Sequence, residues 1–135
     1  MKDDVFIDTN LWIYLYSDKD KGDKVRRLID ESYEEIVIST QVIGEIFSVL
    51  TKKRFTDKKK AKEIAVDLIE NFKVVSINET ITTKAIDVCC RYDYSYWDSL
   101  IVATALENDC STLFSEDLQD NQIIDGKLKI VNPFV

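Results

Sequence analysis

Short apolar runs alternate along this chain with longer segments in which apolar residues recur every three or four positions. The first pattern predicts buried strands, and the second predicts amphipathic helices. Strands are expected at residues 5–7, 36–39, 73–77, 111–115 and 127–131, and helices at residues 10–17, 25–33, 41–53, 58–72, 79–92 and 97–109. Because strands that alternate with helices are typical of an α/β fold, we expect a central, mainly parallel sheet flanked by helices.

Polar residues mark the places where several of these helices begin. Their side chains can accept hydrogen bonds from the free N–H groups of a first helical turn. We expect such caps at Thr9 or Asn10, Ser39 or Thr40, Thr56 or Asp57, and Asn78. The stretch SDKDKGDK (residues 17–24) is charged and contains Gly22, so it predicts a solvated loop, and a second loop is expected between residues 115 and 127.

The composition removes several kinds of chemistry. The chain has no histidine, which excludes serine–histidine and cysteine–histidine catalysis as well as zinc binding through histidine. It has only three glycines, and no glycine-rich loop that would cradle a nucleotide phosphate. The cysteines Cys89, Cys90 and Cys110 show no metal-binding spacing and are odd in number, so reduced, buried thiols are expected.

Length and charge bound the setting of the protein. The 135 residues fit a single domain, residues 1–135, with a core of its own. No apolar run approaches the roughly 18 residues that span a bilayer, and the acidic first residues are unlike a signal peptide, so we expect a cytoplasmic protein. The formal charge of −7 argues against promiscuous binding of nucleic acid, but it is compatible with carboxylate-bound cations or a basic partner protein.

Four acidic residues stand out by their placement. Asp8 follows the first predicted strand, and Asp117 follows the strand at residues 111–115. Ligands of open α/β sheets bind at the carboxyl ends of parallel strands, so these two carboxylates are expected to face one crevice. Glu45 lies in the helix after the second strand and Asp98 in the first turn of its own helix, from where both can reach the same crevice.

Carboxylates gathered in one pocket repel one another and require a counter-charge. A divalent cation supplies that charge, and oxygen ligands without histidine or thiolate favour Mg²⁺ or Mn²⁺, as one ion or two. Such a site lowers the pKa of a bound water and neutralises charge on a reacting phosphate. Each acid also has a structural interpretation: Asp8 or Asp98 as a helix cap, Asp117 in a turn, and Glu45 on an exposed helix face.

Four segments, taken in order, resemble a known family. They are VFIDTNLWIY with Asp8, STQVIGEIFSVL with Glu45, YSYWDSLIVATAL with Asp98, and TLFSEDLQD with Asp117. Together they are similar to the PIN domain and, within that family, to the ribonuclease toxins of VapBC-type toxin–antitoxin pairs. The resemblance runs from Val5 to the C-terminal KIVNPFV. It implies a three-layer α/β/α fold and a metal-dependent endoribonuclease.

The resemblance also implies individual roles. The four acids would hold Mg²⁺ or Mn²⁺ and activate water, leaving 5′-phosphate and 3′-hydroxyl ends on the RNA. Thr9 or Asn10 would support the first carboxylate, and Ser115 would place a hydroxyl beside the metal. The helices would form a homodimer and a groove for a cognate antitoxin segment, with an antitoxin arginine against the acids. Family members often carry glycine in the loop where this chain has Asn121, which leaves the geometry of that loop open.

Two other motifs are rejected on their chemistry. Residues 18–29 have aspartates at calcium-loop spacing, but the glycine and an aspartate are in reversed order and Ile29 stands where glutamate is required. The segment IDTN also resembles the start of aspartyl-phosphate phosphatases, but that class expects a second aspartate at Asn10. A PIN-like protein that binds RNA or a partner without cleaving, and a housekeeping PIN nuclease without an antitoxin, stay open.

Two groups of residues are candidates for RNA contact. A basic cluster begins two helical turns after Glu45, where it can guide phosphates toward the acids or form a solvated helix start. It consists of Lys52, Lys53, Arg54, Lys58, Lys59, Lys60 and Lys62. An aromatic group next to Asp98 can stack unpaired bases or pack against the core or a dimer partner. Its members are Tyr92, Tyr94, Tyr96 and Trp97.

Overall fold

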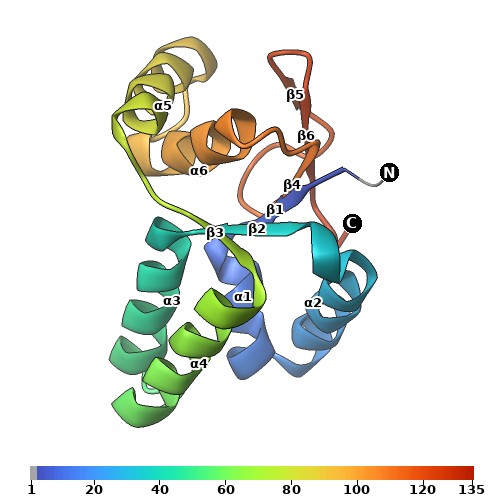
Figure 1. Cartoon of the computed structure of the whole chain (residues 1–135). Coiled ribbons are helices and arrows are strands. Elements are labelled where there is room, and N and C mark those ends of the chain that lie inside the picture. The colour runs from blue at the N-terminus through green and yellow to red at the C-terminus, as the bar shows by residue number, and fades with distance from the viewer. Residues whose placement is uncertain (1–2) are drawn as a thin grey trace.

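The computed structural model describes residues 3–135 (Figure 1). Its strands are β1 (Val5–Ile7), β2 (Ile36–Ser39), β3 (Lys73–Val75), β4 (Thr112–Phe114), β5 (Ile123–Ile124) and β6 (Leu128–Val131). Its helices are α1 (Thr9–Ser17), α2 (Lys19–Ser32), the short 3₁₀ segment η1 (Tyr33–Glu35), α3 (Thr40–Lys52), α4 (Lys58–Asn71), α5 (Glu79–Tyr92) and α6 (Tyr96–Glu107).

A single sheet with the strand order β3-β2-β1-β4-β6-β5 lies at the centre of the fold. All neighbouring strands run parallel except β5 and β6, which are antiparallel. The chain moves outward from β1 through β2 to β3, and then returns to place β4 on the other side of β1. In an open α/β sheet such a reversal opens a crevice at the carboxyl ends of the two central strands, here β1 and β4.

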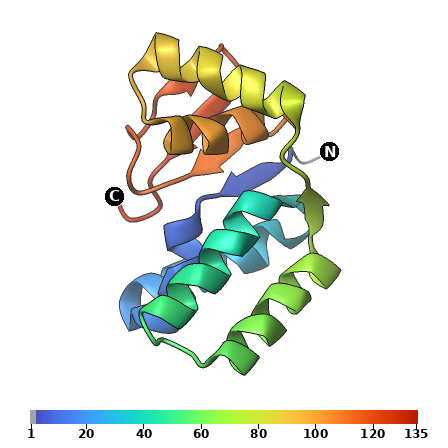
Figure 2. The same cartoon turned by 90° about the vertical axis from the view of Figure 1, so that its left-hand side faces the viewer.

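Helices cover both faces of this sheet. Figure 2 shows α5 and α6 on one side, with α1 to α4 on the other. Right-handed crossovers explain the division, because the connections from β1 to β2 and from β2 to β3 run in one direction and the connection from β3 to β4 runs back. The expected three-layer α/β/α arrangement with a mainly parallel sheet is therefore confirmed.

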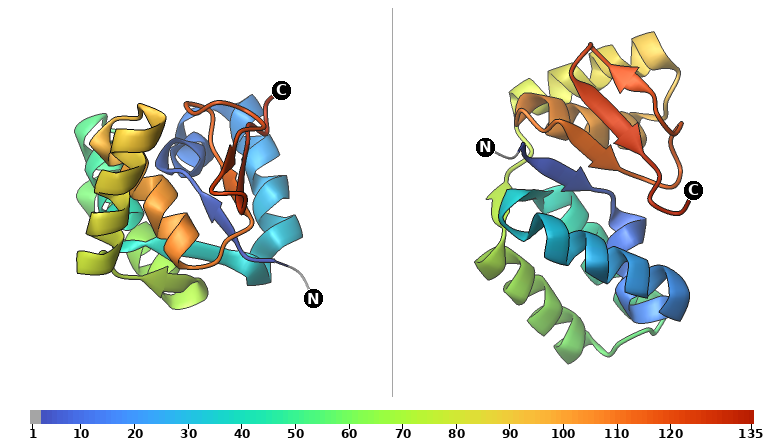
Figure 3. Two further views of the ribbon diagram at one scale, coloured as in Figure 1. Left: turned by 90° about the horizontal axis from the view of Figure 1, so that it is seen from above. Right: turned by 90° about the vertical axis from the view of Figure 1, so that its right-hand side faces the viewer.

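The central strands are buried on both faces, as parallel strands between helical layers must be. Phe6, Ile7 and Ile38 have no exposed surface. Trp12 of α1 anchors the first helix to this layer, because its indole Nε1 donates to the carbonyl oxygen of Ile7 over 3.1 Å and its ring meets Phe72 edge-on. The right-hand view of Figure 3 shows β1 beside the C-terminal strands. The residue that follows β1 is thus held by a rigid support.

The loop predicted at residues 17–24 is wrong, because α2 begins at Lys19. Asp18 caps this helix by accepting a hydrogen bond from the backbone N–H of Lys21. Gly22 serves close helix packing and no turn, since a Cβ added to it would lie 2.6 Å from the carbonyl oxygen of Tyr14. The charged residues of this stretch form the solvated face of a helix.

The predicted helix caps and the predicted loop before the last strand are confirmed only in part. The caps at Ser39, Asp57 and Asn78 are confirmed by side-chain hydrogen bonds to the first turns of α3, α4 and α5. Asp8 caps α1, so its interpretation as a helix cap is confirmed, and the prediction of a cap at Thr9 or Asn10 is wrong. The predicted loop before the last strand contains β5, which was missed.

Two further expectations concern the thiols and the membrane. Cys110 is buried, and burial raises the pKa of its thiol to about 12. Cys89 is half-buried, but Cys90 is exposed, so the prediction of buried thiols fails for that residue. Within residues 3–135, none of the helices combines the length and the apolar character that crossing a bilayer requires.

Candidate functional site

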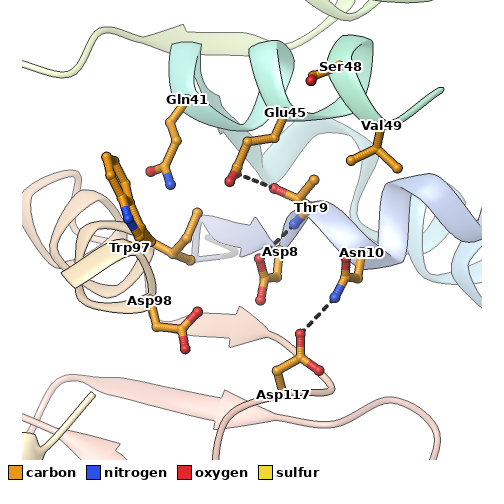
Figure 4. Close-up of a pocket in the computed structure, with 11 residues that line it drawn as sticks. Asp8, Thr9, Asn10, Gln41, Glu45, Ser48, Val49, Trp97, Asp98 and Asp117 are labelled. Carbon is orange, nitrogen blue, oxygen red and sulfur yellow. Dashed lines mark hydrogen bonds between the residues drawn. The ribbon is translucent and has the colours of Figure 1, made fainter. Parts of the chain in front are cut away.

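The crevice between β1 and β4 contains a pocket of about 360 Å³, which we call the acid pocket (Figure 4). All four acids singled out in the sequence line it, and they come from four different segments of the chain. The lining residues are Asp8, Thr9, Asn10, Gln41, Glu45, Ser48, Val49, Trp97, Asp98, Ile101 and Asp117. The fold thus brings together side chains that are up to 109 positions apart in the sequence, from Asp8 to Asp117.

Asp8 is the most enclosed of the four acids, with 9% of its surface exposed. Its Oδ1 accepts from the backbone N–H of Thr9 over 2.7 Å, and its Oδ2 accepts from the hydroxyl of Ser115 over 2.9 Å. Burial raises the pKa of Asp8 to about 6; the two hydrogen bonds oppose that rise, and the negative charges of Asp117 and Asp98 add to it. Asp8 is therefore a helix cap and, at the same time, a carboxylate whose negative charge is disfavoured by burial and by neighbouring acids.

Glu45 reaches the pocket from the second turn of α3, and it is half-buried. The capping of α3 by Ser39 sets the start of the helix directly after β2, so that Glu45 points toward the carboxyl end of the sheet. The hydroxyl of Thr9 donates to Glu45 Oε1 over 2.8 Å. Because Thr9 follows Asp8 directly in the chain, this bond connects the segment that carries Asp8 to the helix that carries Glu45.

Asp98 lies in the first turn of α6 and points into the pocket (Figure 4). The interpretation of Asp98 as the cap of this helix is wrong, because the cap is Ser95, whose hydroxyl accepts from the backbone N–H of Asp98 over 3.1 Å. Asp98 itself occupies the third helical position, where its negative charge also interacts favourably with the helix dipole. Its carboxylate is left for the pocket.

Asp117 enters from the loop after β4, at the exposed edge of the pocket. Its Oδ2 accepts from Asn10 Nδ2 over 2.7 Å. Its neighbour Glu116 fixes the loop, since it accepts hydrogen bonds from the Tyr14 hydroxyl and the Lys21 ammonium. These two donors lower the pKa of Glu116. The early start of α2 therefore matters here, because it places Lys21 against the loop that carries the fourth acid.

The three supporting residues serve different acids. Ser115 contacts Asp8, as expected. Thr9 supports Asp8 through its backbone N–H but directs its hydroxyl to Glu45. The side chain of Asn10 contacts Asp117 and not the first carboxylate. Each of these acids thus has its own polar donor, which limits the conformations that its carboxylate can adopt.

The chemistry of the lining fits a hard divalent cation. It contains four carboxylates and neutral oxygen donors, while no lysine or arginine among the described residues lines it. In the part of the chain described, no three Asp, Glu or Cys side chains already stand as a closed ligand set. Mg²⁺ does not need one, because it usually retains several waters and takes only one or two carboxylates from the protein.

Gln41 was missed as a pocket residue in the sequence. It precedes Glu45 by four positions on α3, and residues with this separation share one face of a helix. That spacing could have identified it once Glu45 was taken as a site residue. Ser48 and Val49 extend the same wall, and Ile101 follows Trp97 by four positions on α6.

The basic cluster lies outside the pocket lining. Its residues are exposed at the end of α3 and the start of α4, the ends of these helices farthest from the sheet (Figure 1). The aromatic group is divided. Tyr92, Tyr94 and Tyr96 pack against buried residues of the core. Trp97 is 65% exposed and lines the acid pocket.

Comparison with known proteins places this architecture in a family. A family model described as the PIN domain matches residues 5–122. The chain therefore belongs to the PIN domain family. No curated protein sequence matches the chain.

Solved structures share the fold at low sequence identity. A "toxin-antitoxin complex from Klebsiella pneumoniae" superposes with a TM-score of 0.74 at 19% identity, over 96% of this chain and 97% of that one. Mycobacterium tuberculosis VapC20, described as a sarcin-ricin loop cleaving toxin, gives a TM-score of 0.70 at 19% identity, over 84% and 89%. DNA-bound VapBC from Salmonella typhimurium gives 0.70 at 15% identity, over 96% and 98%. These likenesses concern the fold.

Proposed function

We propose that the protein is a metal-dependent endoribonuclease that hydrolyses phosphodiester bonds of RNA. The observation that carries the proposal is the acid pocket, in which four carboxylates meet at the switch point of the sheet without a lysine or arginine in the described lining. Membership of the PIN domain family supports this chemistry. The similar fold of a sarcin-ricin loop cleaving toxin supports RNA as the substrate.

The side chains divide the work of this site. Asp8, Glu45, Asp98 and Asp117 would hold one or two Mg²⁺ or Mn²⁺ ions. When bound, the metal supplies a water of lowered pKa and neutralises charge on the phosphate. Ser115 and the backbone N–H of Thr9 orient Asp8, and the hydroxyl of Thr9 fixes Oε1 of Glu45. Oε2 of Glu45 then serves to accept a proton from the attacking water. Water attack on phosphorus would break its bond to the 3′ oxygen, which takes up a proton from solvent, and leave 5′-phosphate and 3′-hydroxyl ends.

The basic cluster would guide the RNA backbone. Lys52 follows the pocket residue Ser48 by four positions, and Glu45 by seven, so all three share one face of α3. Phosphates on either side of the scissile bond can therefore contact the cluster while the scissile phosphate lies at the acids. The overall charge of −7 makes this local excess of cations the favoured place for RNA to approach.

The biological setting would be a toxin–antitoxin pair. The structures with the same fold from Klebsiella pneumoniae and Salmonella typhimurium are complexes of a toxin with its antitoxin. We propose the same setting for the present chain. It would be a single nuclease domain over residues 1–135 that forms a homodimer in the cytoplasm, and a cognate antitoxin would hold this homodimer inactive. An antitoxin arginine against the four acids would supply the missing positive charge.

An RNA cleavage assay tests the proposed activity. Labelled RNA is incubated with Mg²⁺ or Mn²⁺ and wild-type protein, Asp8→Asn, or the matched control Asp125→Asn, which changes an acid outside the pocket lining, between β5 and β6. Wild type and the control should cleave, Asp8→Asn should be slower by about 10² or more, and EDTA should stop the reaction. The products should carry 5′-phosphates that a ligase can join.

Two outcomes would contradict the proposal. Equal cleavage by wild type and Asp8→Asn would remove the catalytic assignment. Binding of RNA without cleavage under any metal would favour a PIN-like protein that binds RNA without hydrolysing it.

A further inference from the structure

Trp97 is a large apolar side chain left in water beside four carboxylates. It is 65% exposed, and it is the aromatic residue among those that line the acid pocket. On one side it is supported by the ring of Tyr96, which packs against it at 77° with centroids 5.1 Å apart. Tyr96 in turn packs on the buried cluster between α5 and α6. An exposed indole at the edge of a polar pocket is a surface on which a planar group can stack.

Gln41 adds a second unusual feature on the same pocket. Its Oε1 is enclosed and has no hydrogen-bond partner among residues 3–135. One helical turn later, Glu45 does receive a donor, the hydroxyl of Thr9. An enclosed carbonyl oxygen without a donor is unfavourable in the free protein, and rotation of the carboxamide toward a donor on a ligand in the pocket removes this penalty. The view of Figure 4 draws the Gln41 carboxamide between the Trp97 indole and the Glu45 carboxylate.

We propose that Trp97 and Gln41 form a nucleobase subsite of the acid pocket. One unpaired base next to the scissile phosphate stacks on the Trp97 indole, and its polar edge bonds to the Gln41 carboxamide. The chemistry fits, because proteins read single-stranded RNA by stacking bases on aromatic rings and by hydrogen bonds to base edges. A carboxamide offers both a donor and an acceptor for such an edge. The proposal rests on the proposed action on RNA, and it assigns how that RNA is positioned.

The position of Trp97 next to Asp98 gives the subsite a function. Both residues belong to the first turn of α6, whose start is fixed by Ser95. A base held on Trp97 thereby places its own phosphate within the pocket that Asp98 lines. Double-stranded RNA cannot offer a splayed base to this surface, so the subsite selects single-stranded loops and ends.

Tryptophan fluorescence tests the proposal, because the chain has two tryptophans in opposite environments. Trp12 is 3% exposed and Trp97 is 65% exposed, so a base that stacks on the surface quenches Trp97 alone. The full-length protein is titrated with a short single-stranded oligoadenylate in Ca²⁺, with gels verifying that the RNA stays intact. The same oligomer with abasic residues, and a duplex of equal length, serve as comparison ligands.

The expected result is quenching by the oligoadenylate and none by the abasic oligomer. Trp97→Ala should weaken binding of the oligoadenylate about tenfold or more and leave binding of the abasic oligomer unchanged. Gln41→Met, which keeps the length of the side chain, should weaken binding of the oligoadenylate about fivefold. Tyr33→Ala is the matched control, because Tyr33 is also exposed (45%) but lies just before β2. This is the amino end of the strand, whereas the acid pocket lies at the carboxyl ends of the strands. Tyr33→Ala should leave affinity and quenching as in wild type.

The other outcomes separate this proposal from the proposed activity. If wild type cleaves RNA but Trp97→Ala binds and cleaves equally well, the subsite is contradicted and the nuclease stands. If quenching occurs as expected and no metal supports cleavage, the activity is contradicted and the subsite stands. If Trp97→Ala changes only the oligomeric state in gel filtration, Trp97 is a contact between copies of the chain, and the subsite is again contradicted.

Discussion

Two aspartates of this chain illustrate opposite ways of placing a negative charge. Asp125, in the turn between β5 and β6, accepts hydrogen bonds from Lys84 over 2.6 Å and from the Tyr92 hydroxyl over 3.1 Å, and it pairs with Arg91 over 2.8 Å. These partners lower its pKa to about 2, with Lys84 as the largest cause. Asp8 is more deeply buried, has only neutral donors, and has its pKa raised to about 6.

The two carboxylates differ in where their counter-charges come from. Asp125 ties α5 to the C-terminal hairpin and has its counter-charges within the chain. Asp8 shares its pocket with three more acids, and the described lining contributes no cation. Sites that bind ligands often retain such unfavourable charge, which a bound group then neutralises. The chain thus separates an acid that stabilises the fold from acids that await a ligand.

The largest expected effect is stabilisation by metal. Mn²⁺ at about 100 times its dissociation constant should raise the unfolding free energy of wild type by about 2.7 kcal/mol, because only the folded state has the site. This corresponds to a rise in Tm on the order of 10 °C. Asp98→Asn should lose most of the shift, whereas Asp125→Asn should retain it. Equal shifts in both variants, measured by calorimetry, would place the metal outside the acid pocket.

The next effect concerns stability without metal. Asp125→Asn should lower the unfolding free energy by about 1 kcal/mol, since it breaks partly buried ion pairs with Lys84 and Arg91, whose other acidic partner is Asp87. Asp8→Asn should cost nothing or stabilise, because it removes an uncompensated buried charge while keeping a cap residue at the start of α1. Urea denaturation in EDTA measures both. If Asp8→Asn proved the more destabilised variant, the contrast between the two acids would be broken.

The smallest effect is a dependence on pH. In the folded protein the pKa of Asp125 lies near 2, below its ordinary value of 3.8. Its stabilising contribution is therefore complete above about pH 4 and is lost as the pH falls toward 2, because the unfolded chain takes up the proton first. The gap in urea midpoint between wild type and Asp125→Asn should close over this range. A gap that stayed constant between pH 6 and pH 2.5 would mean that the ion pair contributes little.

The sequence was sufficient for the parts of the fold that depend on hydrophobic pattern. The predicted strands at residues 5–7 and 36–39 lead to the observed layers, and two acids that follow strands and two that lie in the first two turns of helices lead to one pocket. The wrong predictions concern short local segments. The charged start of α2 resembles a loop because its polar face is long, and the close packing of Gly22 against α1 is a tertiary contact that spacing does not reveal. The two residues of β5 carry too short a pattern to be recognised.

The site was predictable in its acids and less so in their partners. The sequence predicts Asp8 as a helix cap or as a site residue. In the structure it is both, because it caps α1 and also lines the acid pocket. Which donor meets which acid depends on side-chain directions, so the contact of Asn10 with Asp117 could not be derived from spacing. The exposure of Trp97 likewise depends on where α6 begins.

The most direct test of the central claim is to locate Mn²⁺ by anomalous diffraction from crystals of the full chain soaked with the ion. We expect an anomalous peak in the acid pocket, ligated by Asp8 and at least one of Glu45, Asp98 and Asp117, and absent from crystals of Asp8→Asn. A pocket without a peak in wild type, or the same peak in Asp8→Asn, would contradict that claim.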